Sequence, residues 1–451
     1  MEAADVIMKT QSLCPVCFKK IDAEIVSLDG RCDMVKSCPE HGTFQTVVWS
    51  GSTPIQKWIT KRNGALIRNP QMQSEKGCPY DCGLCDEHRQ HTCTALIEVT
   101  QRCNLHCRFC FANSGDCFER DPTIEQIDRL YQCVMKASGG CNIQLSGGEP
   151  TVRDDLPQII RNGKKIGFRF IQVNTNGIRL SQDEKFVEQL KSAGLDSVFL
   201  QFDGTSDEIY QKLRGRRMLA VKTRAIENCR KYGIGVVLVP TLVPGVNTDQ
   251  IGDIIRYALR HIKAVRGVHF QPVSYFGRVP KQPENQDRIT LPQLMDEIEK
   301  QTGGKIKAEN LKPPQCENSL CSFHGNFLSF GNGKLTAVSK SSACCGSAEE
   351  GAVKAKVYVL KNWAGRQANS AKNSSTEKES DWDKILDRIH SSSFSISAMA
   401  FQDIWNVDLN RVRDCCIHVV SPEGKLISFC MYNITDTAGK SLYRNQSQQT
   451  K

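Results

Sequence analysis

Three cysteines lie close together in the run Cys103-Asn-Leu-His-Cys107-Arg-Phe-Cys110. Thiolates at this spacing can bind three irons of a cubane [4Fe–4S] cluster and leave the fourth iron without a protein ligand. A small molecule can bind at such an open iron and be reduced there, whereas most electron-transfer clusters are closed by a fourth cysteine. The spacing therefore predicts that Cys103, Cys107 and Cys110 are catalytic metal ligands.

Most of the other cysteines, of which the 451 residues contain 22 in all, also fall in groups. The chain does not open with a basic-then-apolar secretion signal, so we expect a cytoplasmic protein whose grouped cysteines bind metal and do not form disulfides. The groups are Cys14/Cys17/Cys32/Cys38, Cys78/Cys82/Cys85/Cys93, Cys316/Cys321/Cys344/Cys345 and Cys415/Cys416/Cys430.

The first cysteine group predicts a small metal-binding module over residues 10–60. Cys14/Cys17 and Cys38/His41 form two short knuckles with the spacing of a tetrahedral zinc-ribbon site. Cys32 is the alternative fourth ligand and would give an all-sulfur site able to hold iron. We favour His41 because it completes the second knuckle, and we expect the ion to have a structural role.

Six short apolar or β-branched runs bounded by turn residues are expected to be strands. They cover residues 95–99, 142–145, 168–174, 197–202, 235–240 and 268–272. Helical patterns lie between them, for example over residues 123–137. This alternation predicts an α/β fold of parallel strands joined by right-handed crossovers, in a partial or full (β/α) barrel.

Polar motifs follow the first four of these strands. Residues 103–110 come after the first strand, 146–150 after the second, 174–177 after the third and 201–204 after the fourth. The carboxyl ends of barrel strands carry the chemistry of such folds. We therefore expect the four motifs to meet at one barrel mouth.

The chain resembles the radical S-adenosylmethionine (SAM) superfamily in the triad Cys103-x-x-x-Cys107-x-x-Cys110 followed by Gly147-Gly148-Glu149-Pro150. The resemblance implies a TIM-like partial barrel and a [4Fe–4S] cluster whose unligated iron is chelated by SAM. One electron from the cluster would cleave SAM to methionine and a 5′-deoxyadenosyl radical that takes hydrogen from the substrate.

The resemblance also implies a set of cofactor-binding residues. The glycines let the backbone approach the methionine moiety, Glu149 pairs with its ammonium, and the amides bind ribose or carboxylate. We expect Gln201 and Asp203 to face the same pocket. The set is Gly147, Gly148, Glu149, Pro150, Asn174, Asn176, Gln201 and Asp203.

A narrower resemblance links almost the whole chain to the archaeal tetraether lipid synthase group, whose members are also known as dihydro-hydroxymethylpterin dimethyltransferases. It rests on the N-terminal Cys-Pro-Val-Cys module and on residues 77–85, 241–247 and 270–277. It implies one mononuclear zinc or iron ion and one or two auxiliary [4Fe–4S] clusters besides the SAM-binding cluster.

One auxiliary cluster is expected at Cys78, Cys82 and Cys85, with Cys93 or a nearby histidine as the fourth ligand. A second SAM-binding cluster is the alternative, because the spacing repeats that of the triad. The Gly-Gly-Glu-Pro motif occurs once and no second barrel follows, which favours the auxiliary cluster.

A further auxiliary site is expected near the C-terminus. Its ligands would be Cys316, Cys321, Cys415 and Cys430. The chain also contains the doublets Cys344-Cys345 and Cys415-Cys416. Because their side chains diverge, adjacent cysteines rarely both bind one cluster, so we expect some of these cysteines to be spare thiols.

The expected organisation has six parts. They are the metal module (10–60), an auxiliary-cluster segment (74–94), the barrel (95–280), a C-terminal auxiliary-cluster region (281–363 and 382–434), a mobile linker (364–381) and a disordered tail (435–451).

The sequence is compatible with three functions. The leading hypothesis is a radical SAM enzyme that forms a carbon–carbon bond between lipid chains, and it predicts an apolar tunnel. The alternative is a methyl- or alkyltransferase acting on a pterin or another small metabolite, which predicts a compact cavity. The rival from another class is a non-enzymatic iron–sulfur electron carrier.

The expected partners follow from these hypotheses and from the charge. A lipid or small-molecule substrate and a reductant such as ferredoxin or flavodoxin are expected, with peripheral membrane contact if the substrate is a lipid. The net charge of +10 is spread along the chain, so we expect a solvated basic surface and no nucleic-acid partner.

Overall fold

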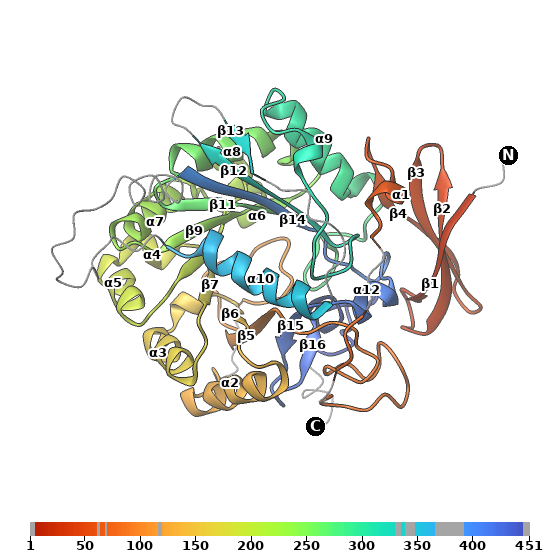
Figure 1. Ribbon diagram of the computed structural model, residues 1–451, viewed down its shortest axis with the longest axis horizontal. Helices are drawn as coiled ribbons and strands as arrows, with labels where there is room; N and C mark the ends of the chain where they lie inside the picture. Colours follow the sequence, from red (N-terminus) through yellow and green to blue (C-terminus); the bar gives the residue numbers. More distant parts are fainter. Residues whose placement is uncertain are drawn as a thin grey trace.

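The chain forms one large α/β body with a small β-sheet projecting from one side (Figure 1). In the computed structural model, the described residues are 5–60, 64–67, 70–115, 120–329, 335–338, 348–365 and 392–444. No helix among these residues is long and apolar enough to span a bilayer.

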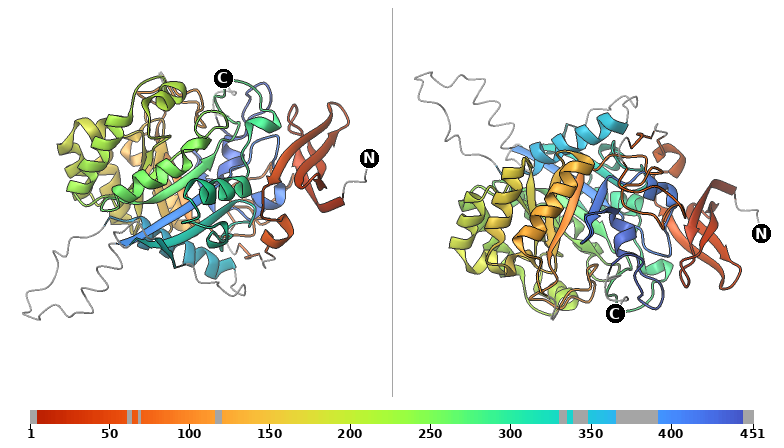
Figure 2. Two further views of the ribbon diagram at one scale, coloured as in Figure 1. Left: turned by 90° about the horizontal axis from the view of Figure 1, so that it is seen from above. Right: turned by 90° about the horizontal axis from the view of Figure 1, so that it is seen from below.

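The projecting sheet is an antiparallel meander of four strands in sequence order. The elements are β1 (Asp5–Leu13), β2 (Lys20–Leu28), β3 (Arg31–Cys38) and β4 (Gly42–Ser50), followed by the short α1 (Ile55–Trp58). Both further views show the sheet standing apart from the barrel (Figure 2). Its β1 side is tied to the C-terminal region, where the Ser12 hydroxyl donates to the carbonyl oxygen of Val407 at 2.5 Å.

The large body is built on a sheet whose middle run, β14-β11-β9-β8-β7-β6-β5-β15, is parallel throughout. The six strands expected from the sequence are all present, with ends shifted by a few residues. They are β5 (Thr94–Thr100), β6 (Asn142–Gly147), β7 (Ile171–Thr175), β8 (Ser197–Gln201), β9 (Gly235–Val239) and β11 (Val265–Pro272). The short β10 (Thr241–Leu242) also pairs with β11.

Helices cover the outer face of this sheet, as crossover connections between parallel strands require (Figure 1). They are α2 (Ile124–Ser138), α3 (Leu156–Ile166), α4 (Ile178–Gln182), α5 (Glu184–Ser192), α6 (Asp207–Arg214), α7 (Leu219–Lys231), α8 (Ile251–Arg260) and α9 (Leu291–Gln301). In α2, a capping box between Thr123 and Gln126 starts the helix, and Ile127, Tyr131 and Val134 bury one face.

The C-terminal region extends both edges of the parallel sheet, which no sequence pattern predicts. β14 (Ser393–Met399) adds to β11, and β15 (Ile417–Val420) adds to β5. Antiparallel strands then complete the two edges. They are β12 (Ser322–Ser329), β13 (Leu335–Ala337) and β16 (Leu426–Ser428).

Three helices among the described residues of this region complete the body. In Figure 1, α10 (Ala348–Trp363) crosses in front of the strands. The short helices α12 (Leu409–Arg413) and α13 (Phe429–Asn433) lie beside the N-terminal sheet and β16, respectively.

One expectation about the tail is wrong. Residues 435–444, expected to be disordered, are ordered: Arg444 is 6% exposed and forms a bidentate pair with Glu98 at 2.7 and 2.9 Å. A buried ion pair holds this segment more firmly than its polar composition indicates. Residues 445–451, and the expected linker from residue 366 on, lie outside the described residues, as do Cys344 and Cys345.

Candidate active site

The cysteine triad lies in the loop that leaves β5, and it lines one wall of a cavity of about 550 Å³. Cys103, Cys107 and Cys110 are all partly exposed. Burial raises the pKa of Cys103 to about 12, so metal binding there must displace a proton from the thiol. The three thiols thus face one cavity at the carboxyl ends of the strands, where they could bind one metal cluster.

Arg278 holds this loop in place, a contact that no sequence motif indicates. Its Nε donates to the Cys107 carbonyl oxygen at 2.9 Å, and its Nη2 donates to that of Ser114 at 2.7 Å. The backbone of Cys110 also exchanges two hydrogen bonds of 3.0 Å with the backbone of Arg278. The triad loop is therefore fixed by the segment that follows β11.

Gly147, the last residue of β6, and the next residue, Gly148, lie against the backbone of β5 and the triad loop. A Cβ on Gly147 would lie 2.0 Å from the Thr100 carbonyl oxygen, and one on Gly148 would lie 2.1 Å from that of Arg102. Only glycine fits at such distances. The two glycines thus let the β6 loop lie directly on the triad loop, and both line the cavity.

Glu149 connects the β6 and β7 loops. One carboxylate oxygen accepts from the Thr151 N–H, the Thr151 hydroxyl and the Thr175 hydroxyl at 3.1, 2.6 and 2.7 Å, and the other accepts from the Asn176 N–H at 2.6 Å. A carboxylate has about four acceptor positions, and the chain's own donors use them. The side chain is 1% exposed. This arrangement favours a positioning role over the pairing with an ammonium that the family resemblance implies.

The three amides expected at the site all line the cavity, but their bonding differs. Asn176 donates to the Asn104 side chain at 2.7 Å and so binds the triad loop. Gln201 accepts from Lys222 at 2.8 Å. Asn174 donates to Ser146 at 3.3 Å, and its Oδ1 is buried without a partner. Among the three amides, Asn174 is thus the one whose oxygen is free to accept a hydrogen bond from a bound molecule.

Asp203 does not line the cavity, contrary to expectation. It is fully buried and accepts two hydrogen bonds from Arg214, at 2.6 and 2.8 Å. Arg214 lines the cavity and its guanidinium interacts with the Cys107 thiol. The Asp203–Arg214 pair therefore places a positive charge beside the triad. No sequence motif predicts this charge, because Arg214 reaches the site from the end of α6.

Lys222 is a second buried cation beneath the site. Its ammonium donates to the Asn176 carbonyl oxygen at 2.5 Å and to the Gln201 side chain at 2.8 Å. Burial lowers its pKa to about 7, an effect that nearby Asp203 opposes. Lys222 therefore connects the loop that follows β7 to the end of β8.

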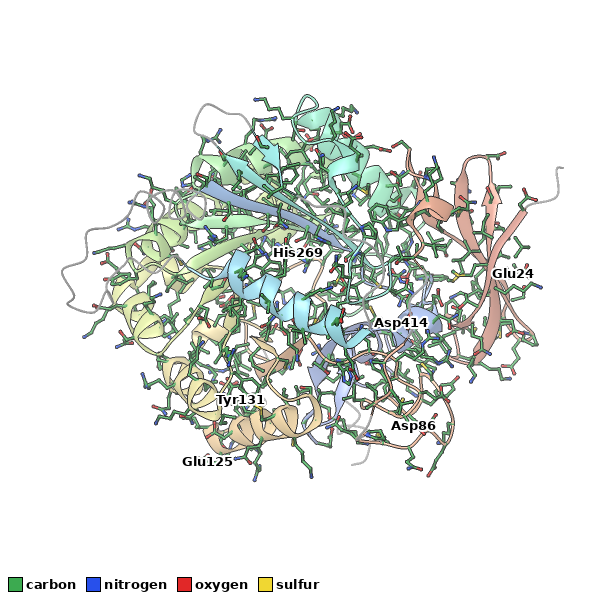
Figure 3. The ribbon with its side chains drawn as sticks, viewed as in Figure 1. Glu24, Asp86, Glu125, Tyr131, His269 and Asp414 are labelled. Atoms are coloured by element: carbon green, nitrogen blue, oxygen red, sulfur yellow. The ribbon has the colours of Figure 1, made fainter. Side chains whose placement is uncertain are left out.

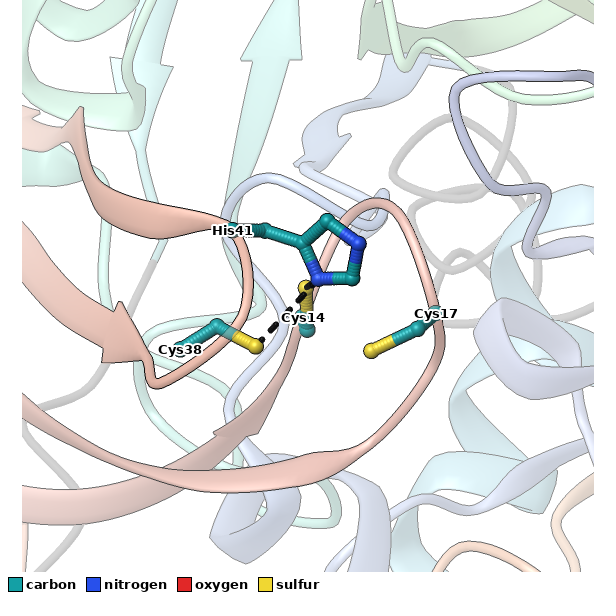
Figure 4. A group of neighbouring side chains, drawn as sticks. All are labelled: Cys14, Cys17, Cys38 and His41. Carbon is teal, nitrogen blue, oxygen red and sulfur yellow. Dashed lines mark hydrogen bonds between the residues drawn. The ribbon is translucent and has the colours of Figure 1, made fainter.

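The N-terminal module brings together Cys14, Cys17, Cys38 and His41, whose ligand atoms all lie within 4.8 Å of one another (Figure 4). The His41 Nδ1 is 3.4 Å from the Cys38 sulfur and 3.6 Å from the Cys14 sulfur. Cys32 instead packs in the hydrophobic core. The geometry thus favours His41 as the fourth ligand.

Comparisons with known proteins agree with this geometry. Residues 97–258 match the radical SAM superfamily, and residues 6–50 match the HMPTM N-terminal zinc ribbon domain. The chain is 37% identical to the 7,8-dihydro-6-hydroxymethylpterin dimethyltransferase of Methanocaldococcus jannaschii, over 94% of this chain and 93% of that protein. The chain belongs to the radical SAM superfamily.

Other relatives match less than half of the chain. A probable GTP 3′,8-cyclase of Methanococcus aeolicus is 32% identical over 42% of this chain and 62% of that protein. The crystal structure of SuiB from Streptococcus suis aligns with a TM-score of 0.38 and 16% identity, over 47% of this chain and 46% of that one.

The family assignment confirms an α/β radical SAM fold and an enzyme. It favours the alternative of a methyl- or alkyltransferase over the leading hypothesis of lipid-chain coupling, and it gives no support to a lipid substrate. The family assignment gives no support to the third hypothesis, a non-enzymatic electron carrier.

The residues present fit the cofactors of a radical SAM enzyme. Three thiols face the cavity, glycines remove the Cβ atoms that would separate the two loops, and the Asn174 Oδ1 is an orphaned acceptor. A [4Fe–4S] cluster and SAM are the groups that this family binds at such residues.

Cys78, Cys82 and Cys85 lie together around a small cleft that includes His88. Cys93, expected as a fourth ligand, is not part of this group. The nearby-histidine alternative fits better: the His88 Nε2 lies 2.7 Å from the Cys415 carbonyl oxygen, so it must donate, and Nδ1 is left with its lone pair. Burial lowers the pKa of His88 to about 4, which keeps the ring neutral.

The expected C-terminal ligand set is divided between two places. Cys321, Cys415 and Cys430 interact electrostatically with one another, and Arg411 donates to the Cys321 sulfur at 3.3 Å. Cys316 lies elsewhere, in a group with Cys93 and Cys416 whose sulfurs are all within 4.8 Å of one another. Sequence grouping fails here because the sheet pairs β5 with β15, which brings distant cysteines together.

Proposed function

We propose that the chain is a radical SAM methyl- or alkyltransferase whose substrate is a small planar heterocycle of the pterin type. The named activity of the relative at 37% identity supports this substrate class. The observation on which the proposal rests is an aromatic wall in the cavity, next to the inward-facing amides.

The aromatic wall consists of Phe199, His269 and Trp363. Ring centroids lie 5.2 Å apart for Phe199 and His269, 5.4 Å for Phe199 and Trp363, and 5.8 Å for His269 and Trp363. Figure 3 places His269 near the centre of the barrel, beside α10. The three rings therefore pack on one another and also line the cavity, and an aromatic side chain on a cavity wall can stack on a planar ring.

Polar groups beside this wall suit the edge of a heterocycle. The Trp363 Nε1 is buried without a partner, so it is available as a donor. Burial lowers the pKa of His269 to about 4, so the ring is neutral, and its Nδ1 pairs with Ser397 at 2.8 Å. Gln144 and Gln271 line the same cavity. Such a pocket combines apolar walls with a few placed polar groups, as small-molecule sites do.

The size of the cavity also supports a small substrate. A volume of about 550 Å³ lies within the range of ordinary ligand pockets, about 300–1,000 Å³. Coupling two long lipid chains would need an extended apolar tunnel, whereas amide side chains on β6, β8 and β11 place polar groups among the apolar walls of this cavity.

We assign the SAM-binding cluster and SAM to the residues at the strand ends that face the cavity. Cys103, Cys107 and Cys110 would hold the SAM-binding [4Fe–4S] cluster, which with SAM supplies reductive cleavage to methionine and a 5′-deoxyadenosyl radical. Gly147, Gly148 and Pro150 shape the backbone that would receive the methionine moiety, and the Asn174 Oδ1 accepts from its polar groups. Arg214 keeps a positive charge beside the thiolates and Lys222 fixes the amides.

We assign auxiliary [4Fe–4S] clusters to two other groups. One is Cys78, Cys82 and Cys85 with His88, and the other is Cys321, Cys415 and Cys430. The zinc-ribbon module would hold one mononuclear ion. A low-potential reductant such as ferredoxin or flavodoxin would supply electrons.

The experiment that tests this function measures turnover. The anaerobically reconstituted enzyme is incubated with SAM, dithionite and a dihydropterin, and 5′-deoxyadenosine and methylated pterin are measured by mass spectrometry. We expect both products, and neither from the Cys103/Cys107/Cys110 triple alanine variant. Stimulation of SAM cleavage by a dialkyl lipid and not by the pterin would overturn the substrate class.

A binding experiment tests the aromatic wall separately. Quenching of pterin fluorescence reports binding to the enzyme without turnover. We expect Trp363→Leu to weaken binding about tenfold, because it removes both a stacking face and a donor. Trp405→Leu is the matched control, because Trp405 packs on Phe44 of the N-terminal module. Equal effects of the two substitutions would contradict the assignment.

A further inference from the structure

Cys93, Cys316 and Cys416 form a group of their own, separate from the triad and from the two groups assigned to auxiliary clusters, although the sequence predicts Cys93 and Cys316 in auxiliary sets. Cys93 directly precedes β5, and Cys416 directly precedes β15, the strand paired with β5. The Cys93 N–H donates to the Cys416 carbonyl oxygen at 2.8 Å, and the two sulfurs lie 3.0 Å apart. Cys316 completes the group from the loop that precedes β12.

The spacing of the sulfurs distinguishes a single ion from a cubane. Thiolates on one zinc ion, each about 2.3 Å from the metal, lie roughly 4 Å apart in a tetrahedron. Cysteines of a cubane bind different irons, so their sulfurs are held farther apart by the iron–iron separations. Among the described residues, only the zinc-ribbon group and this one have three or more ligand atoms all within 4.8 Å.

The three cysteines also face the cavity. All three line the same cavity as the catalytic triad, together with Glu317. The Cys416 thiol lies 3.6 Å from one Glu317 carboxylate oxygen, and the other accepts from Ser322 at 2.5 Å. Glu317 is not within 4.8 Å of all three sulfurs, so it is placed to accept a proton from Cys416 and not to complete the tetrahedron.

We propose that Cys93, Cys316 and Cys416 bind one thiophilic divalent ion, such as Zn²⁺, whose fourth coordination position opens on the cavity. Metal binding releases the thiol protons, and Glu317 accepts the one from Cys416. Three protein ligands and one exchangeable position are the arrangement of catalytic zinc sites. The open position would take a nitrogen or oxygen donor of a molecule held in the cavity. The proposal does not depend on the identity of that molecule.

Metal and sulfide counts test the proposal on the full chain, produced anaerobically with iron, sulfide and zinc supplied. Zinc, iron and acid-labile sulfide are measured per chain. We expect two mononuclear ions in the wild type, one in Cys17→Ser, whose exposed ligand belongs to the zinc ribbon, and one in Cys416→Ser. Sulfide should be equal in all three. Cys229→Ser, a buried cysteine outside every group, is the matched control and should keep both ions.

Several results would overturn the proposal. They are a single mononuclear ion in the wild type, a Cys416→Ser chain that loses the iron and sulfide of a cluster, or a Cys93–Cys416 disulfide found by peptide mapping. If Cys416→Ser fails to fold, the counts for the wild type and Cys17→Ser still decide the question.

A spectroscopic experiment tests the open position. Co²⁺ is exchanged into the Cys17→Ser chain, and imidazole is added as a nitrogen donor. We expect the visible d–d bands to shift as imidazole binds. Bands that do not change would show that the coordination sphere is closed and would overturn this part of the proposal.

Discussion

Glu149→Gln separates a positioning role of Glu149 from a direct role in binding SAM. The substitution keeps the shape of the side chain and replaces one acceptor oxygen with a donor amide. If the remaining carbonyl oxygen keeps the bonds from Thr151 and Thr175, the new amide faces the Asn176 N–H, which lies 2.6 Å from the carboxylate in the wild type. Two donors then face each other in a buried site.

The magnitude follows from these contacts. A hydrogen bond to a charged group contributes about 1.5–3 kcal/mol, and a stranded buried N–H costs about 1–3 kcal/mol. Because the two terms overlap, we expect the free energy of unfolding to fall by about 3 kcal/mol. Glu184→Gln is the control, since Glu184 is exposed and solvent screens its pair with Lys231, which should contribute little to stability.

The assay is urea unfolding of the anaerobic holoenzyme, followed by tryptophan fluorescence, together with equilibrium dialysis of SAM. A positioning role predicts that stability and SAM binding fall together. An unfolding free energy within about 0.5 kcal/mol of the wild type, with SAM binding alone weakened, would contradict the positioning role and restore the direct pairing with the ammonium.

Lys222, Gly148 and Cys38 each allow a further test. Because burial lowers the pKa of Lys222 from 10.5 to about 7, the folded state binds fewer protons than the unfolded state between these values. The free energy of unfolding of the wild type should therefore rise with pH between about 7 and 10.5, and this gain is absent at and below pH 7. Urea unfolding at several pH values should show that Lys222→Met lacks this pH-dependent contribution. Gly148→Ala should lower the thermal midpoint of unfolding by an amount equivalent to about 1–3 kcal/mol, because the new Cβ would clash with the backbone. Gly140→Ala is the control and should leave the midpoint unchanged, since a Cβ there has nothing within 4 Å. Equal midpoints for the two variants would contradict the close packing at Gly148. Cys38→Ser should release one metal ion and raise hydrogen exchange in the N-terminal sheet while barrel iron is retained, and loss of that iron would show that the module supports the catalytic site.

Local patterns are sufficient to predict the barrel. The six strands and the helix at residues 124–138 can be found because alternating apolar runs, turn residues and a capping box act over a few positions. The triad and Gly147–Gly148 are predictable for the same reason, since each motif lies in one short segment at a strand end. His41 can be chosen over Cys32 from knuckle spacing alone.

Contacts between distant segments account for what the patterns miss. Arg214 and Lys222 reach the site from helices, so only the packed fold shows that they hold Asp203, Asn176 and Gln201. β14 and β15 escape prediction because their partners lie far away in the chain.

The cysteines show most clearly where local spacing stops being informative. Residue spacing alone establishes an open-cluster triad and many metal-binding thiols, because ligand spacing within a loop is a local property. Which distant cysteines share a site depends on the packing of the whole chain. Pairing of β5 with β15 places Cys93 beside Cys416, and Cys316 joins them from a third segment. Long-range strand pairing has no signature in residue spacing, so only the fold reveals this group.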